Sequence, residues 1–207
     1  MPRKATFTRD EIIMKALTIV RQNGEQALSA RSLAAALHTS SSPIFTLFSG
    51  MDEVMKEVRI KAHKMFADYV ADVNSYTPAF KEFGLRFVRF AHQERNLFNY
   101  LFISQGTRLD VVEPKAMECL RDICSDYGLT PEQGNTLFRN IWTFSCGLAM
   151  ISNQGNEPLP EEAIGELLSF QFVSSVSFIK SGRPLPIITP HLRSENEKTT
   201  LEMDFNK

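Results

Sequence analysis

Along most of the chain, apolar residues recur at intervals of three and four positions, and the alternation typical of a half-buried strand is nearly absent. One early run passes through Ile13, Leu17 and Val20 and stops at Gly24. The pattern therefore predicts an all-α protein of about nine helices. We expect these helices at about residues 9–23, 30–37, 41–48, 51–75, 79–93, 96–104, 114–127, 131–152 and 161–181.

Capping signals mark several of the predicted helix starts. Thr8 with Glu11, and Thr130 with Gln133, have the spacing of a capping box, in which the two residues satisfy each other's free amide groups. Ser40 is the candidate N-cap of the third helix. These signals fix where the helices begin more firmly than periodicity alone can.

The second and third predicted helices are short, follow a longer helix and are separated by a break at His38. This arrangement is typical of a helix-turn-helix, whose last helix inserts its N-terminal end into the major groove of DNA. Short polar side chains are suited to that end, and Ser41, Ser42 and Thr46 provide them. Arg31 begins the second helix, where its guanidinium can reach a phosphate.

Charge is distributed unevenly, although the formal net charge of the 207 residues is only -1. Residues 1–65 contain ten Lys/Arg against six Asp/Glu, whereas the remainder contains thirteen against eighteen. A basic N-terminal part on an acidic remainder suits nucleic-acid binding at one end of the molecule.

Several other classes of protein find no support in the sequence. Hydrophobic residues make up 43% of the chain, which is enough for a core, but no apolar run approaches the roughly 20 residues of a membrane span. The three cysteines, an odd and sparse set, and the lack of a secretory signal favour the cytoplasm. No catalytic triad, phosphate loop, paired-acid motif or set of metal ligands is visible, so we expect no enzymatic activity, no cofactor and no metal.

The segment from Leu28 to Val54, LSARSLAAALHTSSSPIFTLFSGMDEV, resembles the N-terminal domain of TetR-family transcriptional regulators, and the likeness extends over residues 7–60. The resemblance implies a helix-turn-helix domain over 1–50, with a connecting helix to about 65, and a ligand-binding and dimerisation domain over 51–182. We expect the polar remainder, 183–207, to be a mobile tail. The resemblance and the residue pattern together predict a DNA-binding set of Arg31, Ser40, Ser41, Ser42, Pro43, Phe45, Thr46, Leu47 and Lys56.

The chain departs from the family at positions that usually contact phosphate. His38 replaces the usual turn glycine, and Phe45 lacks the hydroxyl that an aromatic residue there normally offers to a phosphate. Leu47 stands where histidine is frequent, and Met51 stands where a lysine commonly opens the fourth helix. We therefore expect DNA binding to depend on Arg31, Thr46, Lys56 and an N-terminal arm containing Arg3 and Lys4.

The C-terminal part is rich in aromatic residues. Twelve of the sixteen phenylalanines lie between Phe66 and Phe178, a content that suits either a packed core or an apolar ligand pocket. The segments FAHQERNLFNYLF (90–102) and IWTFSCGLAMI (141–151) resemble TetR-family C-terminal domains, with Cys146 in place of a histidine. From this resemblance we expect a pocket lined by Phe87, Phe90, Phe98, Phe102, Trp142 and Cys146.

The last two predicted helices are apolar on most sides and contain several small residues, as surfaces buried on both faces do. In TetR-like proteins the corresponding pair forms a four-helix dimer interface, which here predicts contacts by Ser145, Leu148, Leu167, Gln171, Ser174, Ser175 and Phe178. The function implied is that of a homodimeric repressor, released from its DNA operator by a small apolar or aromatic effector. The alternative is a dimeric ligand-binding or protein-interaction module whose head has lost operator binding.

Overall fold

The computed structural model describes residues 7–104 and 114–183, and within these ranges it contains nine α-helices and no strand. The predicted all-α fold is therefore confirmed for the described part of the chain. The helices are α1 (Arg9–Asn23), α2 (Ala30–Ala36), α3 (Ser42–Leu47), α4 (Met51–Tyr69), α5 (Ala79–Gln93), α6 (Arg95–Phe98), α7 (Pro114–Tyr127), α8 (Pro131–Gln154) and α9 (Glu161–Lys180).

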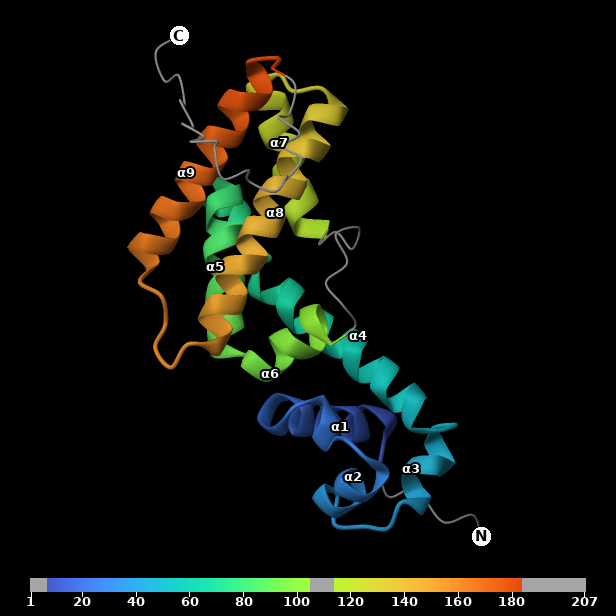
Figure 1. Ribbon diagram of the computed structural model, residues 1–207. Coiled ribbons are helices and arrows are strands. Elements are labelled where there is room, and N and C mark those ends of the chain that lie inside the picture. The colour runs from blue at the N-terminus through green and yellow to red at the C-terminus, as the bar shows by residue number, and fades with distance from the viewer. Residues whose placement is uncertain (1–6, 105–113, 184–207) are drawn as a thin grey trace, which may run out of the picture.

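The helices form a small head at one end of an elongated molecule and a larger body at the other (Figure 1). The head consists of α1, α2 and α3, and α4 leads out of it toward the body. In the body, α5 packs against both α8 and α9, and α7 packs against α5 and α8. The short α6 lies against α1, so the head touches the body there as well as through α4.

Both predicted capping boxes are present. The Glu11 amide donates to Thr8 Oγ1 at 3.2 Å, and the Thr8 amide donates to Glu11 Oε2 at 2.7 Å. At the start of α8, the Gln133 amide donates to Thr130 Oγ1 at 3.3 Å, and the Thr130 amide donates to Gln133 Oε1 at 2.9 Å. These contacts satisfy amide groups that have no partner within the helix.

Two local predictions were wrong. The residue before α3 is Ser41, not Ser40, and its backbone is already helical (φ -71°, ψ -14°) with no side-chain capping bond. The fourth helix ends at Tyr69 rather than near residue 75, and Arg86 of α5 donates a hydrogen bond to the Tyr69 carbonyl oxygen at 2.9 Å. The last carbonyl groups of a helix have no partner within it, and here a side chain from another helix satisfies one of them.

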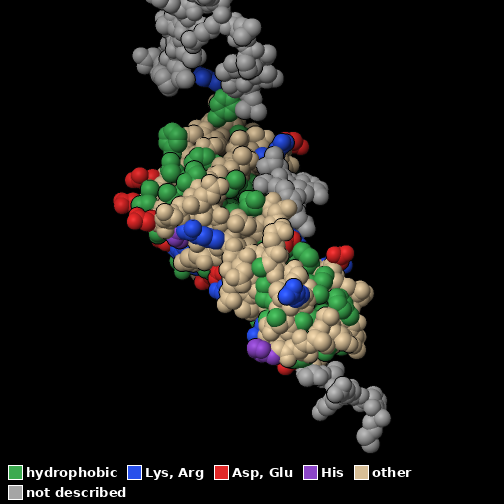
Figure 2. Space-filling model, turned by 60° about the horizontal axis from the view of Figure 1, so that its bottom comes forward, with side chains coloured by type: hydrophobic (Ala, Val, Ile, Leu, Met, Phe, Trp, Pro, Cys, Tyr) green, Lys and Arg blue, Asp and Glu red, His purple; other side chains and the backbone are tan. Residues whose placement is uncertain are grey.

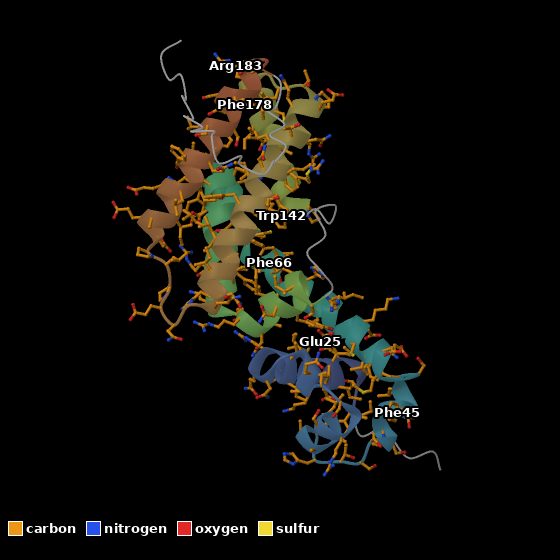
Figure 3. The ribbon with its side chains drawn as sticks, in the orientation of Figure 1. Glu25, Phe45, Phe66, Trp142, Phe178 and Arg183 are labelled. Atoms are coloured by element: carbon orange, nitrogen blue, oxygen red, sulfur yellow. The ribbon has the colours of Figure 1, made fainter. Side chains whose placement is uncertain are left out.

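A cluster of aromatic rings fills the centre of the body. Phe66 of α4 is fully buried and makes edge-on contacts with four phenylalanine rings at centroid distances of 5.0 to 6.4 Å. Phe87 joins this group to Trp142 of α8 at 5.0 Å, and both labelled residues, Phe66 and Trp142, lie inside the body in Figure 3. We call this the ring cluster; its members are Phe66, Phe83, Phe87, Phe90, Phe98, Phe102 and Trp142.

The segment expected as a helix over 96–104 is irregular: α6 gives way to a π-helical turn, Asn99–Ile103. Among the described residues, no helix has both the length and the hydropathy needed to cross a membrane.

Candidate nucleic-acid interface and ligand cavity

The turn between α2 and α3 is closed by backbone hydrogen bonds. The amides of His38 and Thr39 donate to the carbonyl oxygens of Ala35 and Ala34, each at 3.0 Å. His38 has φ 53°, in the left-handed region that favours glycine. The turn therefore keeps a left-handed conformation although its residue is histidine, at a cost of about 1 kcal/mol.

Arg9 of α1 holds the end of α3 and the start of α4 together. Its guanidinium hydrogen-bonds to the Leu47 carbonyl oxygen and to the carboxylates of Glu53 and Glu57, and it lies 4.1 Å from the centre of the Phe48 ring. Three hydrogen bonds lower the pKa of the Glu53 carboxyl to about 2: the largest effect comes from the Ser49 amide, the next from Arg9 and the smallest from the Ser49 hydroxyl. The sequence analysis missed this group because its members are far apart in the sequence.

The outward face of α3 consists of Ser42, Phe45 and Thr46, whereas Ile44 between them is fully buried. We call these three residues the α3 face. Figure 3 shows Phe45 on α3 at the end of the molecule remote from Phe178. Of the predicted DNA-binding residues, Arg31, Ser40, Ser42, Phe45, Thr46 and Lys56 are exposed, and Ser41, Pro43 and Leu47 are partly buried.

Few positive charges in the head and α4 are free. Of the eight Lys/Arg described between residues 7 and 65, five form ion pairs with carboxylates: Arg9, Arg21, Arg59, Lys61 and Lys64. Lys15, Arg31 and Lys56 have no ion pair within the described residues. When the head end is brought forward, tan and green surface predominates over charged groups (Figure 2). Arg3 and Lys4, predicted as an arm, lie outside the described residues, as does 184–207 of the predicted tail.

A cavity of about 430 Å³ lies in the body between α5, α7, α8 and α9. Its walls are mainly aromatic and aliphatic, with the charged residues Lys81 and Asp126 and several hydroxyl groups among them. The residues that line it are Thr77, Pro78, Phe80, Lys81, Phe83, Gly84, Ile123, Asp126, Tyr127, Ile141, Trp142, Ser145, Leu168, Ser169, Phe172 and Val173.

The expected pocket lining agrees with this cavity only at Trp142, whose indole Nε1 is buried and has no hydrogen-bond partner among the described residues. The four phenylalanines of that expected set (Phe87, Phe90, Phe98 and Phe102) belong to the ring cluster, where they pack against other rings. Burial raises the pKa of the Cys146 thiol to about 11, so this side chain is uncharged near neutral pH. Among the described residues, no three His, Cys, Asp or Glu side chains are grouped as a metal site requires.

Comparison with known proteins identifies the fold. No family model matches the chain, and no curated protein matches it significantly. A solved TetR-family member, SCO1917 from Streptomyces coelicolor A3, superposes with a TM-score of 0.56 and 20% identity over 82% of this chain and 98% of that one. Apo ActR from Streptomyces coelicolor gives a TM-score of 0.50 and 19% identity over 87% of this chain and 96% of that one. The chain has the TetR-family fold.

In this TetR-type fold, one group of contacts joins head, α4 and body; we call it the junction. Arg59 of α4 donates to the carbonyl oxygen of Tyr100 at 2.7 Å, lies 4.2 Å from the centre of its ring and forms an ion pair with Glu25 at 3.8 Å. The Tyr100 hydroxyl donates in turn to the Met55 carbonyl oxygen at 2.7 Å. Tyr100 sits in the π-helical turn, between Phe98 and Phe102 of the ring cluster.

The seven residues predicted for the dimer interface do not lie on one surface. Ser145 and Leu148 are buried within the chain, and Ser145 lines the cavity. Gln171, Ser174, Ser175 and Phe178 line a groove of about 500 Å³ between the first half of α8 and the second half of α9, and Leu167 is exposed. Other exposed apolar side chains of α8 and α9, missed by sequence analysis, are Phe170, Val173, Met150 and Ile151.

Proposed function

We propose that this chain is a DNA-binding transcriptional repressor of the cytoplasm that leaves its operator when a small apolar or aromatic molecule occupies the cavity. The observation that carries the proposal is α3, which presents the exposed side chains of Ser42, Phe45 and Thr46 at the free end of the head in a helix-turn-helix. Arg31 and Lys56, exposed and without ion pairs among the described residues, are available for phosphates on either side of it.

A continuous series of contacts supports communication between cavity and head. Phe83 and Trp142 belong both to the cavity wall and to the ring cluster. The ring cluster reaches Phe98 and Phe102, which flank Tyr100 at the junction. A ligand that prefers one arrangement of these rings would shift the position of α4 and therefore of the head.

The proposed operator-binding unit is a homodimer, because two heads reading two half-sites gain affinity over one. The exposed apolar side chains Leu167, Phe170 and Val173 of α9 give a second copy a surface to bury. The predicted residues on the nearby groove, Gln171 and Ser174 among them, would lie at the margin of this contact.

The decisive experiment selects DNA from a pool of random duplexes with the full chain and then screens apolar and aromatic compounds against the complex. Compounds that bind the cavity should raise the melting temperature and release the selected DNA together. Ser169→Leu places extra volume in the cavity, since Ser169 lines it and, within the described part of the chain, its hydroxyl bonds only to the Gly165 carbonyl oxygen of its own helix. This variant should bind DNA normally and lose both compound effects.

Ser125→Leu is the matched control, because Ser125 is exposed on α7 and does not line the cavity. It should respond to the compounds as the wild type does. Failure to select any sequence would refute the repressor and favour the alternative of a binding module with an inactive head. Compounds that stabilise the protein without changing DNA affinity would refute only the induction mechanism.

A further inference from the structure

The α3 face lacks the groups that most often read bases. The helix Ser42–Leu47 has the sequence SPIFTL, with no arginine, lysine, asparagine or glutamine. Bidentate contacts to guanine require Arg or Lys, and those to adenine require Asn or Gln. Specificity in this helix must therefore come from smaller polar groups or from apolar contact.

The Thr46 hydroxyl is already engaged within the helix. Its Oγ1 donates to the Ser42 carbonyl oxygen at 2.9 Å. A hydroxyl has one proton, so Thr46 can only accept a further hydrogen bond, and its methyl group is the remaining part available for contact. Thr46 therefore adds apolar as well as polar character to the α3 face.

Phe45 is the largest side chain of the α3 face and is 46% exposed, while Ile44 next to it is fully buried. The core of the head is thus complete without the outer part of the Phe45 ring. Phe45 lies in the middle of a helix that would enter the major groove, and part of its ring is exposed to water. Contact between this ring and an apolar group of the DNA would bury apolar surface and so favour binding. The apolar group on the base edges of that groove is the thymine C5-methyl.

We propose that the α3 face reads thymine methyl groups, with Phe45 as the principal specificity-determining residue and the Thr46 methyl beside it. The inference rests on the proposed function, since it requires that the head binds DNA. The scarcity of free cations among the described residues of the head and α4 supports it, because a head with few phosphate contacts depends more on contacts to the bases. The half-site is then expected to contain thymine at the positions that α3 covers.

The test uses the sequence selected by the full-length wild type. Each thymine of a half-site is replaced singly by deoxyuridine, which removes the methyl group and leaves base pairing unchanged. At one or two positions the wild type should lose affinity by about fourfold, the effect of burying one methyl group. Phe45→Ala should bind the thymine and deoxyuridine duplexes equally well, and Phe45→Tyr, which keeps the ring, should retain the difference.

Met14→Ala is the matched control, because Met14 is also an exposed apolar side chain of the head, on α1. It should show the wild-type loss at the same positions. The proposal is overturned if no deoxyuridine weakens wild-type binding, or if Phe45→Ala shows the same loss as the wild type; operator binding itself would stand in both cases. If the wild type selects no sequence, the proposed function fails and this inference fails with it.

Discussion

Arg31 and Lys56 are exposed cations that flank α3 in the sequence and have no carboxylate partner among the described residues. Each phosphate contact contributes about 0.9 to the slope of log affinity against log salt. Replacing Arg31 by alanine should therefore weaken binding to selected and random DNA alike and lower that slope by about 1 per head.

Titrations at several salt concentrations measure both quantities. Arg121→Ala, which removes an exposed arginine of α7 with no ion pair among the described residues, should change neither. An Arg31→Ala variant with wild-type affinity and slope would remove Arg31 from the interface.

The Glu53 carboxylate accepts hydrogen bonds from Arg9 of α1 and from Ser49, and it stays ionised at acidic pH. Hydrogen bonds from the Ser49 amide and from Arg9 lower its pKa to about 2 from a usual value near 4.5. Because the folded-state pKa is depressed, the stabilisation is present above about pH 4.5 and is lost as the pH falls toward 2. The melting temperature of Glu53→Gln should therefore lie below that of the wild type at neutral pH. This gap between the two melting temperatures should narrow between pH 4.5 and 2.

Thermal denaturation at a series of pH values measures this gap. The control is Glu162→Gln, which removes an exposed carboxylate in the first turn of α9. A gap that stays constant down to pH 2.5 would show that the charge of Glu53 is not its source.

At the scale of the elements, the sequence predicted what is local. The start of α1 was predictable because Thr8 and Glu11 bond to each other within one turn. The contacts between α4 and α5 were not predictable, because the hydrogen bond from Arg86 to the Tyr69 carbonyl oxygen and the ring contact between Phe66 and Phe87 both join residues of different helices. The lining of this cavity was not predictable for the same reason: which phenylalanines pack together and which face open space is decided by tertiary packing.

The exposed face of α9, proposed above as the dimer surface, was equally hidden, because α9 is apolar on most sides and its periodicity does not separate inner from outer positions. In the structure Phe170 is 73% exposed, whereas Ser175 is 9% exposed. A charge at Ser175 would therefore disturb the chain itself, and Phe170 is the better probe of self-association.

Phe170→Glu should split the proposed dimer while leaving the monomer folded, because the new carboxylate is costly only when a second copy buries it. Sedimentation at micromolar concentration measures the change, and circular dichroism checks the fold. Ser125→Glu, at an exposed position on α7, should remain a dimer. A wild type that sediments as a monomer would contradict the homodimer.

At the scale of the whole molecule, the junction is one of two places where the head meets the body, the other being the contact between α1 and α6, and the proposed body-to-head signal can be tested there. Two hydrogen bonds fix the π-helical turn to α4: Arg59 to the Tyr100 carbonyl oxygen, and the Tyr100 hydroxyl to the Met55 carbonyl oxygen. Coupling between sites is reciprocal in free energy, so DNA bound at the head must affect this turn if events at the turn affect the head. The route can therefore be tested with DNA alone, before any effector is identified.

DNA binding should slow hydrogen exchange of the amides in Asn99–Ile103, because it restrains α4 and, through Met55, the turn. Tyr100→Phe keeps the buried ring but deletes the hydroxyl bond, a change worth about 1 kcal/mol, and should reduce that protection. Tyr76→Phe is the matched control, since Tyr76 is 47% exposed and lies outside the junction. Exchange measured by mass spectrometry with and without the selected duplex decides the question: equal protection in Tyr100→Phe and wild type would mean that the head and body communicate by another path.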